Sequence, residues 1–195
     1  MTMPPVPLEI PAELCGTVGA PMSTPAGVCL DQVLTDVNDD GVSAPKTDDI
    51  AGLRQVVADA KQHGIDLKVV VVPQNPYIEA PLRDVATEIG HANPESTVLV
   101  LSPSFAGTYS AHYDRATLEA GQDVAKTAGT PVQGAKNFVS QLQAPEFPWT
   151  ALTIVLVVVV AIATVLTRVL QVRAKRAGKA KSPAAEIEPT AADPA

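Results

Sequence analysis

Four helices are predicted along the chain, and apolar residues at helical spacing support three of them. Thr47-Asp48-Asp49 is expected to open the first helix, because a hydroxyl and acidic side chains suit a helix N-terminus, and Gly64 is expected to end it. The second helix is predicted over Glu79–His91 and the third over Asp114–Ala128, and the fourth begins at Thr130-Pro131. The inward positions are Ile50, Leu53, Val56, Val57 and Ala60 in the first, Leu82, Val85, Ala86 and Ile89 in the second, and Val132, Ala135, Phe138, Val139 and Leu142 in the fourth.

Short β-branched runs separate these helices. Val69–Val72 is unbroken, as expected for a central strand covered on both faces, and "TVLVLSP" is the second such strand. "AGTYSAHY" places Tyr109, Ala111 and Tyr113 on one face and predicts a third strand, paired to the second as a hairpin. A further strand is expected near Val33–Val37. The alternation predicts an α/β fold, a compact three-layer sandwich with a mostly parallel central sheet and helices on both faces.

The chain is predicted to divide into five segments. They are a Pro-rich N-terminal segment over 1–30, the α/β domain over 31–143, a linker over 144–148, a transmembrane helix over 149–170 and a tail over 171–195. The linker holds two prolines and is short, so we expect the domain to sit close to the membrane surface. The tail is first basic and then rich in Ala, Pro and Glu, which predicts disorder after Pro183.

The stretch Trp149–Thr167 contains no charged residue and is rich in Val, Leu, Ile and Ala. A helix rises about 1.5 Å per residue, so a span of this length crosses a hydrocarbon core of about 30 Å. Trp149 suits an aromatic anchor at the membrane interface. A basic run without acids follows and is expected to bind anionic lipids; it includes Arg168, Arg173, Lys175 and Arg176.

The basic flank also predicts the orientation, because Lys and Arg beside a span stay in the cytoplasm. The tail is then cytoplasmic and the N-terminal domain lies outside the cell. Residues 1–30 contain no Lys or Arg and no apolar run of signal-peptide length, so the domain would cross without a cleavable signal. The alternative is a tail-anchored protein whose domain is in the cytoplasm.

The chain has two cysteines, Cys15 and Cys29, on either side of a segment rich in Gly, Pro, Ser and Thr. Outside the cell, such a pair suggests a disulfide, worth about 3 kcal/mol in the chain-entropy model. Two unrelated thiols are the alternative.

Charge and motifs narrow the function. Residues 1–147 hold eight Lys or Arg against eighteen Asp or Glu, and this acidic balance argues against nucleic-acid binding. GxSxG, GxGxxG and Walker patterns do not occur, and His63, His91 and His112 are scattered. We therefore expect no catalytic residue and no cofactor.

Acidic residues gather at Asp36, Asp39, Asp40, Asp48 and Asp49. "DVNDDGVS" resembles half of a calcium loop, which makes Asp36, Asp39 and Asp40 the candidate metal ligands. The bidentate Glu of such a loop is missing, however, and a solvated turn followed by a helix cap explains the same residues. The turn is the preferred interpretation.

Two loops follow the predicted central strands, Pro73–Tyr77 and Ser102–Phe105. Ligands and partners approach open α/β sheets at the carboxyl ends of their strands. The loops hold amides, hydroxyls and aromatic rings but no acid–base pair, a composition that favours contact over catalysis. The expected partner contacts, with plain turns as the alternative, are Gln74, Asn75, Tyr77, Ser104 and Phe105.

The stretch "LTDVNDDGVSAPKTDDIAGLRQVVADAKQHGIDLKVVVVPQ", followed by "STVLVLSP", resembles a TPM domain. With "IPAELCGT" and the late anchor, the chain is similar to small membrane proteins of mycobacteria and corynebacteria that are encoded beside a RipA-type, NlpC-class cell-wall endopeptidase. The resemblance implies a compact α/β sandwich that faces the cell wall. It also implies binding to the helical N-terminal region of the endopeptidase, which would relieve autoinhibition during cell separation.

Two functions follow as hypotheses. The first is a membrane-anchored, non-enzymatic regulator that binds and activates a peptidoglycan endopeptidase in cell division. The alternative is a metal-dependent phosphatase of the TPM type that uses the Asp36–Asp49 cluster.

Overall fold

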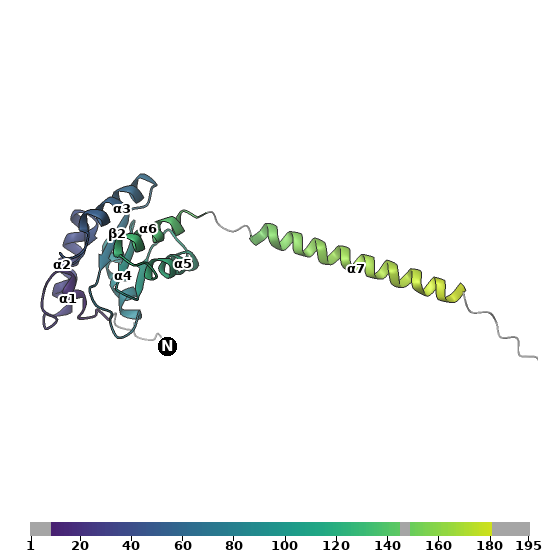
Figure 1. Cartoon of the computed structure of the whole chain (residues 1–195), viewed down its shortest axis with the longest axis horizontal. Coiled ribbons are helices and arrows are strands. Elements are labelled where there is room, and N and C mark those ends of the chain that lie inside the picture. Colours follow the sequence, from purple (N-terminus) through teal and green to yellow (C-terminus); the bar gives the residue numbers. More distant parts are fainter. Residues whose placement is uncertain (1–8, 145–148, 181–195) are drawn as a thin grey trace, which may run out of the picture. The chain divides into compact units, whose positions relative to one another are not determined.

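The computed structural model describes residues 9–144 and 149–180, with side chains over 9–144 and 152–173. The chain forms two units, Met1–Ala144 and Pro145–Ala195, which are described separately (Figure 1).

The first unit is built on a four-stranded sheet. Its strands are β1 (Val42–Ser43), β2 (Leu67–Val71), β3 (Thr97–Leu101) and β4 (Ala106–Tyr109), and they lie in the order β1-β2-β3-β4. β1, β2 and β3 are parallel, and β4 returns antiparallel to β3. The predicted central strands, the hairpin and the mostly parallel sheet are confirmed.

Helices cover both faces of this sheet. They are α1 (Leu14–Thr17), α2 (Ala26–Asp39), α3 (Ile50–Gln62), α4 (Ala80–Ala92), α5 (Arg115–Lys126) and α6 (Pro131–Leu142). Side chains of β2 and of Val72, which follows it, alternate between the layers. Leu67, Val69 and Val71 pack with α3, α5 and α6, whereas Val70 and Val72 pack with α1, α2 and α4. The predicted three-layer sandwich is therefore confirmed.

The two parallel crossovers have opposite hands. Both step the same way across the sheet, from β1 to β2 and from β2 to β3, yet α3 lies on one face and α4 on the other. Right-handed connections strongly prevail in proteins, so one of the two departs from the rule. As a result, the N-termini of α3 and α4 flank the carboxyl ends of the strands from opposite sides.

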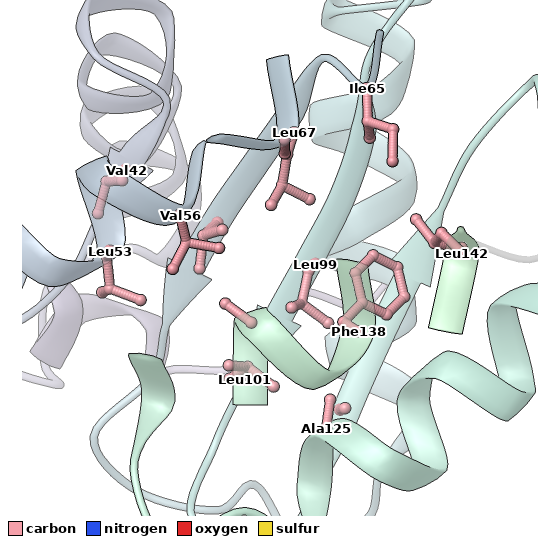
Figure 2. Close-up of a cluster of buried hydrophobic side chains, with 14 of the residues drawn as sticks. Val42, Leu53, Val56, Ile65, Leu67, Leu99, Leu101, Ala125, Phe138 and Leu142 are labelled. Atoms are coloured by element: carbon pink, nitrogen blue, oxygen red, sulfur yellow. The ribbon is translucent and has the colours of Figure 1, made fainter. Parts of the chain in front are cut away.

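The core between the sheet and α3, α5 and α6 is shown in Figure 2, where the Phe138 side chain lies among aliphatic residues. Phe138 is fully buried, as are Leu53 of α3 and Leu99 of β3. The predicted inward positions of α3, α4 and α6 are all buried or packed against one of the two core clusters. The 3.6-residue period identified them because one stripe of each helix meets the sheet.

The strand predicted near Val33–Val37 is wrong, since these residues belong to α2. The buried residues of α2 are Cys29, Val33 and Val37, spaced four apart as on a helix face. Gly41 follows α2 with φ at 83°, and its amide donates to the Val37 carbonyl at 3.1 Å, which makes it a left-handed helix cap. The predicted boundary between residues 30 and 31 consequently falls inside α2.

Two local details also differ from expectation. Asp49 rather than Thr47 caps α3, its carboxylate accepting from the Gly52 amide at 2.8 Å. β4 ends at Tyr109, so the alternation predicted to Ala111 and Tyr113 is wrong. The Ser110 hydroxyl accepts from the His112 amide at 3.1 Å, and this bond turns the chain away from the sheet.

The second unit is the helix α7 (Trp149–Ala180). Within it, Leu152–Arg173 is long and apolar enough to cross a membrane. The predicted span over 149–170 lies inside α7, which continues beyond it. Residues 145–148 of the linker, the tail from 181 and the side chains of Trp149, Lys175 and Arg176 lie outside the described residues.

Candidate functional site

Two loops at the carboxyl ends of β2 and β3 are joined through one side chain. The Asn75 side-chain oxygen accepts from the Ser102 hydroxyl at 2.8 Å and from the Ser104 amide at 2.9 Å. The Ser102 amide in turn donates to the Phe105 carbonyl at 2.9 Å, closing the β3–β4 turn. Asn75 thus fixes the loop after β2 to the turn after β3.

The joined loops present a large aromatic side chain to solvent. Tyr77 is 98% exposed and its neighbour Ile78 is 49% exposed. Gln74 and Ser104 are exposed as well, whereas Phe105 is partly buried against the core on the α4 face. Of the five expected contacts, Gln74, Asn75, Tyr77 and Ser104 are therefore exposed, although the Asn75 side chain also holds the loops together, while Phe105 contributes to the core.

A cavity of about 360 Å³, here called the inner hollow, opens at the same edge of the sheet. Its walls come from the ends of β2 and β3 and from the loop between α5 and α6. Prolines form much of the lining: Pro45, Pro73, Pro103 and Pro131. Since proline fixes its own φ angle, the backbone of these walls is restricted at four positions.

The inner hollow contains one carboxylate, Asp48, and one ammonium, Lys126. Burial raises the pKa of Asp48 above its ordinary value. The Lys126 ammonium is bonded to Asp123 at 2.7 Å, and this hydrogen bond raises the pKa of Lys126. Among the described residues, no hydrogen bond or ion pair reaches the Asp48 carboxylate.

A second and larger cavity of about 990 Å³, here called the outer hollow, lies beside the first. The two share Pro45, Thr47 and Pro73 in their linings. Asp36 and Asp39 line the outer hollow from α2, facing Arg54 of α3. The carboxyl edge of the sheet therefore carries a groove in two parts, separated by Pro45, Thr47 and Pro73.

The acidic cluster predicted from the sequence is divided by the structure. Asp48 lines the inner hollow, while Asp36, Asp39 and Asp40 line the outer one. The Asp36 carboxylate accepts from the Ser43 hydroxyl at 2.7 Å, and Asp40 forms an ion pair with Arg54. Over residues 9–144 and 152–173, no three His, Cys, Asp or Glu side chains lie together in a way that could hold a metal ion.

A disulfide between Cys15 and Cys29 supports one wall of the outer hollow. Both cysteines are fully buried, and their Cα atoms lie 5.0 Å apart. The bond joins α1 to α2, and the nearby Thr17 hydroxyl donates to the Val71 carbonyl of β2 at 2.9 Å. Together they attach the N-terminal helices to the carboxyl end of the sheet.

Sequence reasoning missed the contribution of the α5–α6 loop to this edge. Lys126 and Thr130 reach the inner hollow from a segment that is distant in sequence from both strands. Turn residues predict a loop here, but only the packing of α5 and α6 shows that this loop lines the inner hollow. The sequence also could not predict that Asp48 lines a different cavity from Asp36, Asp39 and Asp40, because nearby acids look alike in sequence.

No solved structure matches this chain. A family model described as "Membrane protein Rv1476" matches residues 23–183. Membrane protein Rv1476 of Mycobacterium tuberculosis is 47% identical over 156 residues, which cover 80% of this chain and 83% of that protein. The matched region includes most of the α/β unit and α7, and the chain belongs to the Rv1476 family of membrane proteins.

Proposed function

We propose that this chain is a membrane-anchored, non-enzymatic regulator whose α/β unit binds an NlpC-class cell-wall endopeptidase and promotes its activity in cell separation. The partner contact is the helical N-terminal region of the endopeptidase. The observation that carries the proposal is the presentation of Tyr77, 98% exposed, on loops that Asn75 holds together.

An exposed tyrosine on a fixed loop is available to a partner. Tyrosine is enriched among the residues that dominate binding energy, because it contributes a large, rigid contact area. Loops that are already held in place lose less conformational entropy on binding. The groove formed by the two hollows adds a concave surface at the same edge of the sheet.

The proposal requires the α/β unit to lie outside the cell. Two features support this orientation: the disulfide, which persists in oxidising compartments, and the cations that follow the apolar part of α7, beginning with Arg168 and Arg173. A cysteine introduced at exposed Lys136 should react with a membrane-impermeant maleimide in intact cells. One introduced at Ser182 should react only after lysis, and the reverse pattern would contradict the orientation.

Activation needs only a difference in affinity between two states of the endopeptidase. A regulator that binds the active conformation more tightly shifts the population toward it. Anchoring by α7 keeps both proteins at the membrane, which raises their effective concentration.

The function is tested with the full chain in lipid nanodiscs and the purified endopeptidase. Binding is measured by biolayer interferometry, and endopeptidase activity is measured as peptide release from peptidoglycan. We expect a stable complex and faster release. Absence of a complex together with unchanged release would overturn the proposal.

The alternative, a metal-dependent phosphatase, draws less support from the geometry. Asp40 is paired with Arg54, Asp36 accepts from Ser43 and Asp49 caps α3, so these acids have structural partners. Hydrolysis of p-nitrophenyl phosphate in calcium or magnesium, abolished by Asp39→Asn with Asp40→Asn, would reverse this preference.

A further inference from the structure

Asp48 differs from Asp36, Asp40 and Asp49 because it faces a cavity and has no counter-ion or hydrogen-bond partner among the described residues. Asp36, Asp40 and Asp49 each accept a hydrogen bond from a neighbouring group, and Asp40 also has Arg54. Over the described residues, the Asp48 carboxylate has neither an ion pair nor a hydrogen bond. Partial removal from water without a partner disfavours the charged form of a carboxyl group, which agrees with its raised pKa.

The cations near the inner hollow do not supply this counter-ion. Lys126 lines the hollow, but its ammonium is bonded to Asp123 and is also attracted by Glu79. Lys46 is exposed and lines the outer hollow, and Arg54 is paired with Asp40. A positive charge that entered the inner hollow would therefore find an unneutralised carboxylate.

The remaining lining suits a long side chain with a charged end. Four prolines offer apolar walls, and the hydroxyl-bearing residues Thr47, Ser102 and Thr130 stand among them. The stems of Lys and Arg pack on apolar surface while their charged heads seek polar partners. A volume of about 360 Å³ is at the lower end of the range for ligand sites, which suits one side chain better than a large ligand.

We propose that the inner hollow receives one basic side chain, arginine or lysine, from the partner protein, with Asp48 as its counter-ion. This proposal rests on the proposed function, because it takes the partner to be the helical region of the endopeptidase. Tyr77 then contributes contact area at the rim, and Asp48 selects a basic residue at one position of the partner. Removing one member of such a pair is expected to weaken the complex at least tenfold.

The first test does not involve the endopeptidase. The nitrogen-15-labelled full chain in detergent micelles is titrated with N-acetyl-arginine amide and with the neutral citrulline analogue, and amide shifts are followed by NMR. We expect the arginine probe to shift Thr47, Ser102 and Thr130 and the citrulline probe to leave them unchanged.

Two variants with the same change in charge complete this test. Asp48→Asn should abolish the shifts, whereas Asp31→Asn, at an exposed position of α2 that lines neither hollow, should retain them. Equal shifts with citrulline, or shifts that survive Asp48→Asn, would overturn the proposal.

The second test measures endopeptidase binding to the same variants in nanodiscs. Binding weakened at least tenfold by Asp48→Asn and retained in Asp31→Asn supports the proposal. Unchanged binding to Asp48→Asn overturns it and leaves the proposed function standing. If the wild-type chain responds to the arginine probe but does not bind the endopeptidase, the proposed function is overturned, while the preference of the inner hollow for a cation is supported.

Discussion

At the amino ends of β2 and β3, several polar side chains are paired with one another, whereas at the carboxyl ends the described residues include a carboxylate without a partner. Ser96 donates to Asp66, and the Thr97 and Ser110 hydroxyls are bonded at 2.9 Å. At the opposite end, Asn75 joins two loops, yet Asp48 has no counter-ion among the described residues and Tyr77 is 98% exposed. We infer that one end closes the sheet and that the other is open to the proposed contact.

The largest expected effect comes from removing the disulfide with Cys15→Ser and Cys29→Ser. The loss should be about 3 kcal/mol of unfolding free energy, or roughly 10 °C in Tm. Because the disulfide secures α1, which bonds to Val71, the carboxyl end should loosen more than the amino end. Thermal melting and hydrogen exchange check this, with faster exchange expected near Val71 than at Thr97. Equal acceleration at both ends would contradict the comparison.

A smaller loss is expected for Asn75→Ala, which removes two hydrogen bonds worth about 1 kcal/mol each. Endopeptidase affinity should fall as well, since the loops that carry Tyr77 are no longer joined. The matched control is Asn93→Ala at the amino end of β3, where the side chain donates one bond to the Ile89 carbonyl at 3.1 Å. Chemical denaturation and interferometry should show a loss of affinity for the first variant and none for the second.

The smallest effects are two pH-dependent changes of opposite sign. Burial raises the pKa of Asp48, so its ionisation costs stability above the ordinary value of 3.8. Asp48→Asn should therefore raise Tm at pH 7, by no more than about 2 °C, and the gain should vanish below pH 3.8. If Asp48→Asn is slightly more stable than the wild type but binds the partner less tightly, Asp48 is retained for contact and not for stability.

Asp114 provides the opposite case at the amino end. Hydrogen bonds from the Thr117 amide and hydroxyl lower its pKa, so its charge contributes stability above 3.8 that is lost as the pH falls through the lowered value. Asp114→Asn should lower Tm at pH 7 and match the wild type in strong acid. Melting curves between pH 2 and pH 7 test both variants, and shifts of the same sign in both would contradict the account.

The sheet and most helices could be predicted because their signals are local. Leu53, Val56 and Ala60 repeat at helical spacing, which predicts a helix buried on one face. Val69–Val72 is an unbroken apolar run, which predicts a strand buried on both faces. α2 was missed although Cys29, Val33 and Val37 are four residues apart and Gly41 follows them, a helix-end signal that was interpreted instead as part of a solvated turn. The exposed Tyr77 loop was anticipated, since strand ends in α/β sheets are recognisable in sequence.

The inner hollow could not be predicted, because it depends on distant elements. Its lining joins Asp48, Ser102 and Thr130, which come from the segment before α3, the end of β3 and the loop before α6. The hydrogen bonds that distinguish Asp48 from Asp40 and Asp49 are also tertiary or capping contacts. The five acids look alike in sequence, and only the fold shows which of them have hydrogen-bond or ion-pair partners.

The central claim is that the carboxyl end of the sheet binds the partner, and one affinity comparison tests it most directly. The affinity for the endopeptidase is measured for the full chain in nanodiscs as the wild type, Tyr77→Ala and Met22→Ala. Met22→Ala is the control, because it removes another exposed side chain, 45% exposed, on the α1–α2 loop. Tyr77→Ala should weaken binding more than tenfold with an unchanged Tm, and Met22→Ala should leave it within twofold. Equal affinities for all three would place the contact elsewhere and contradict the account.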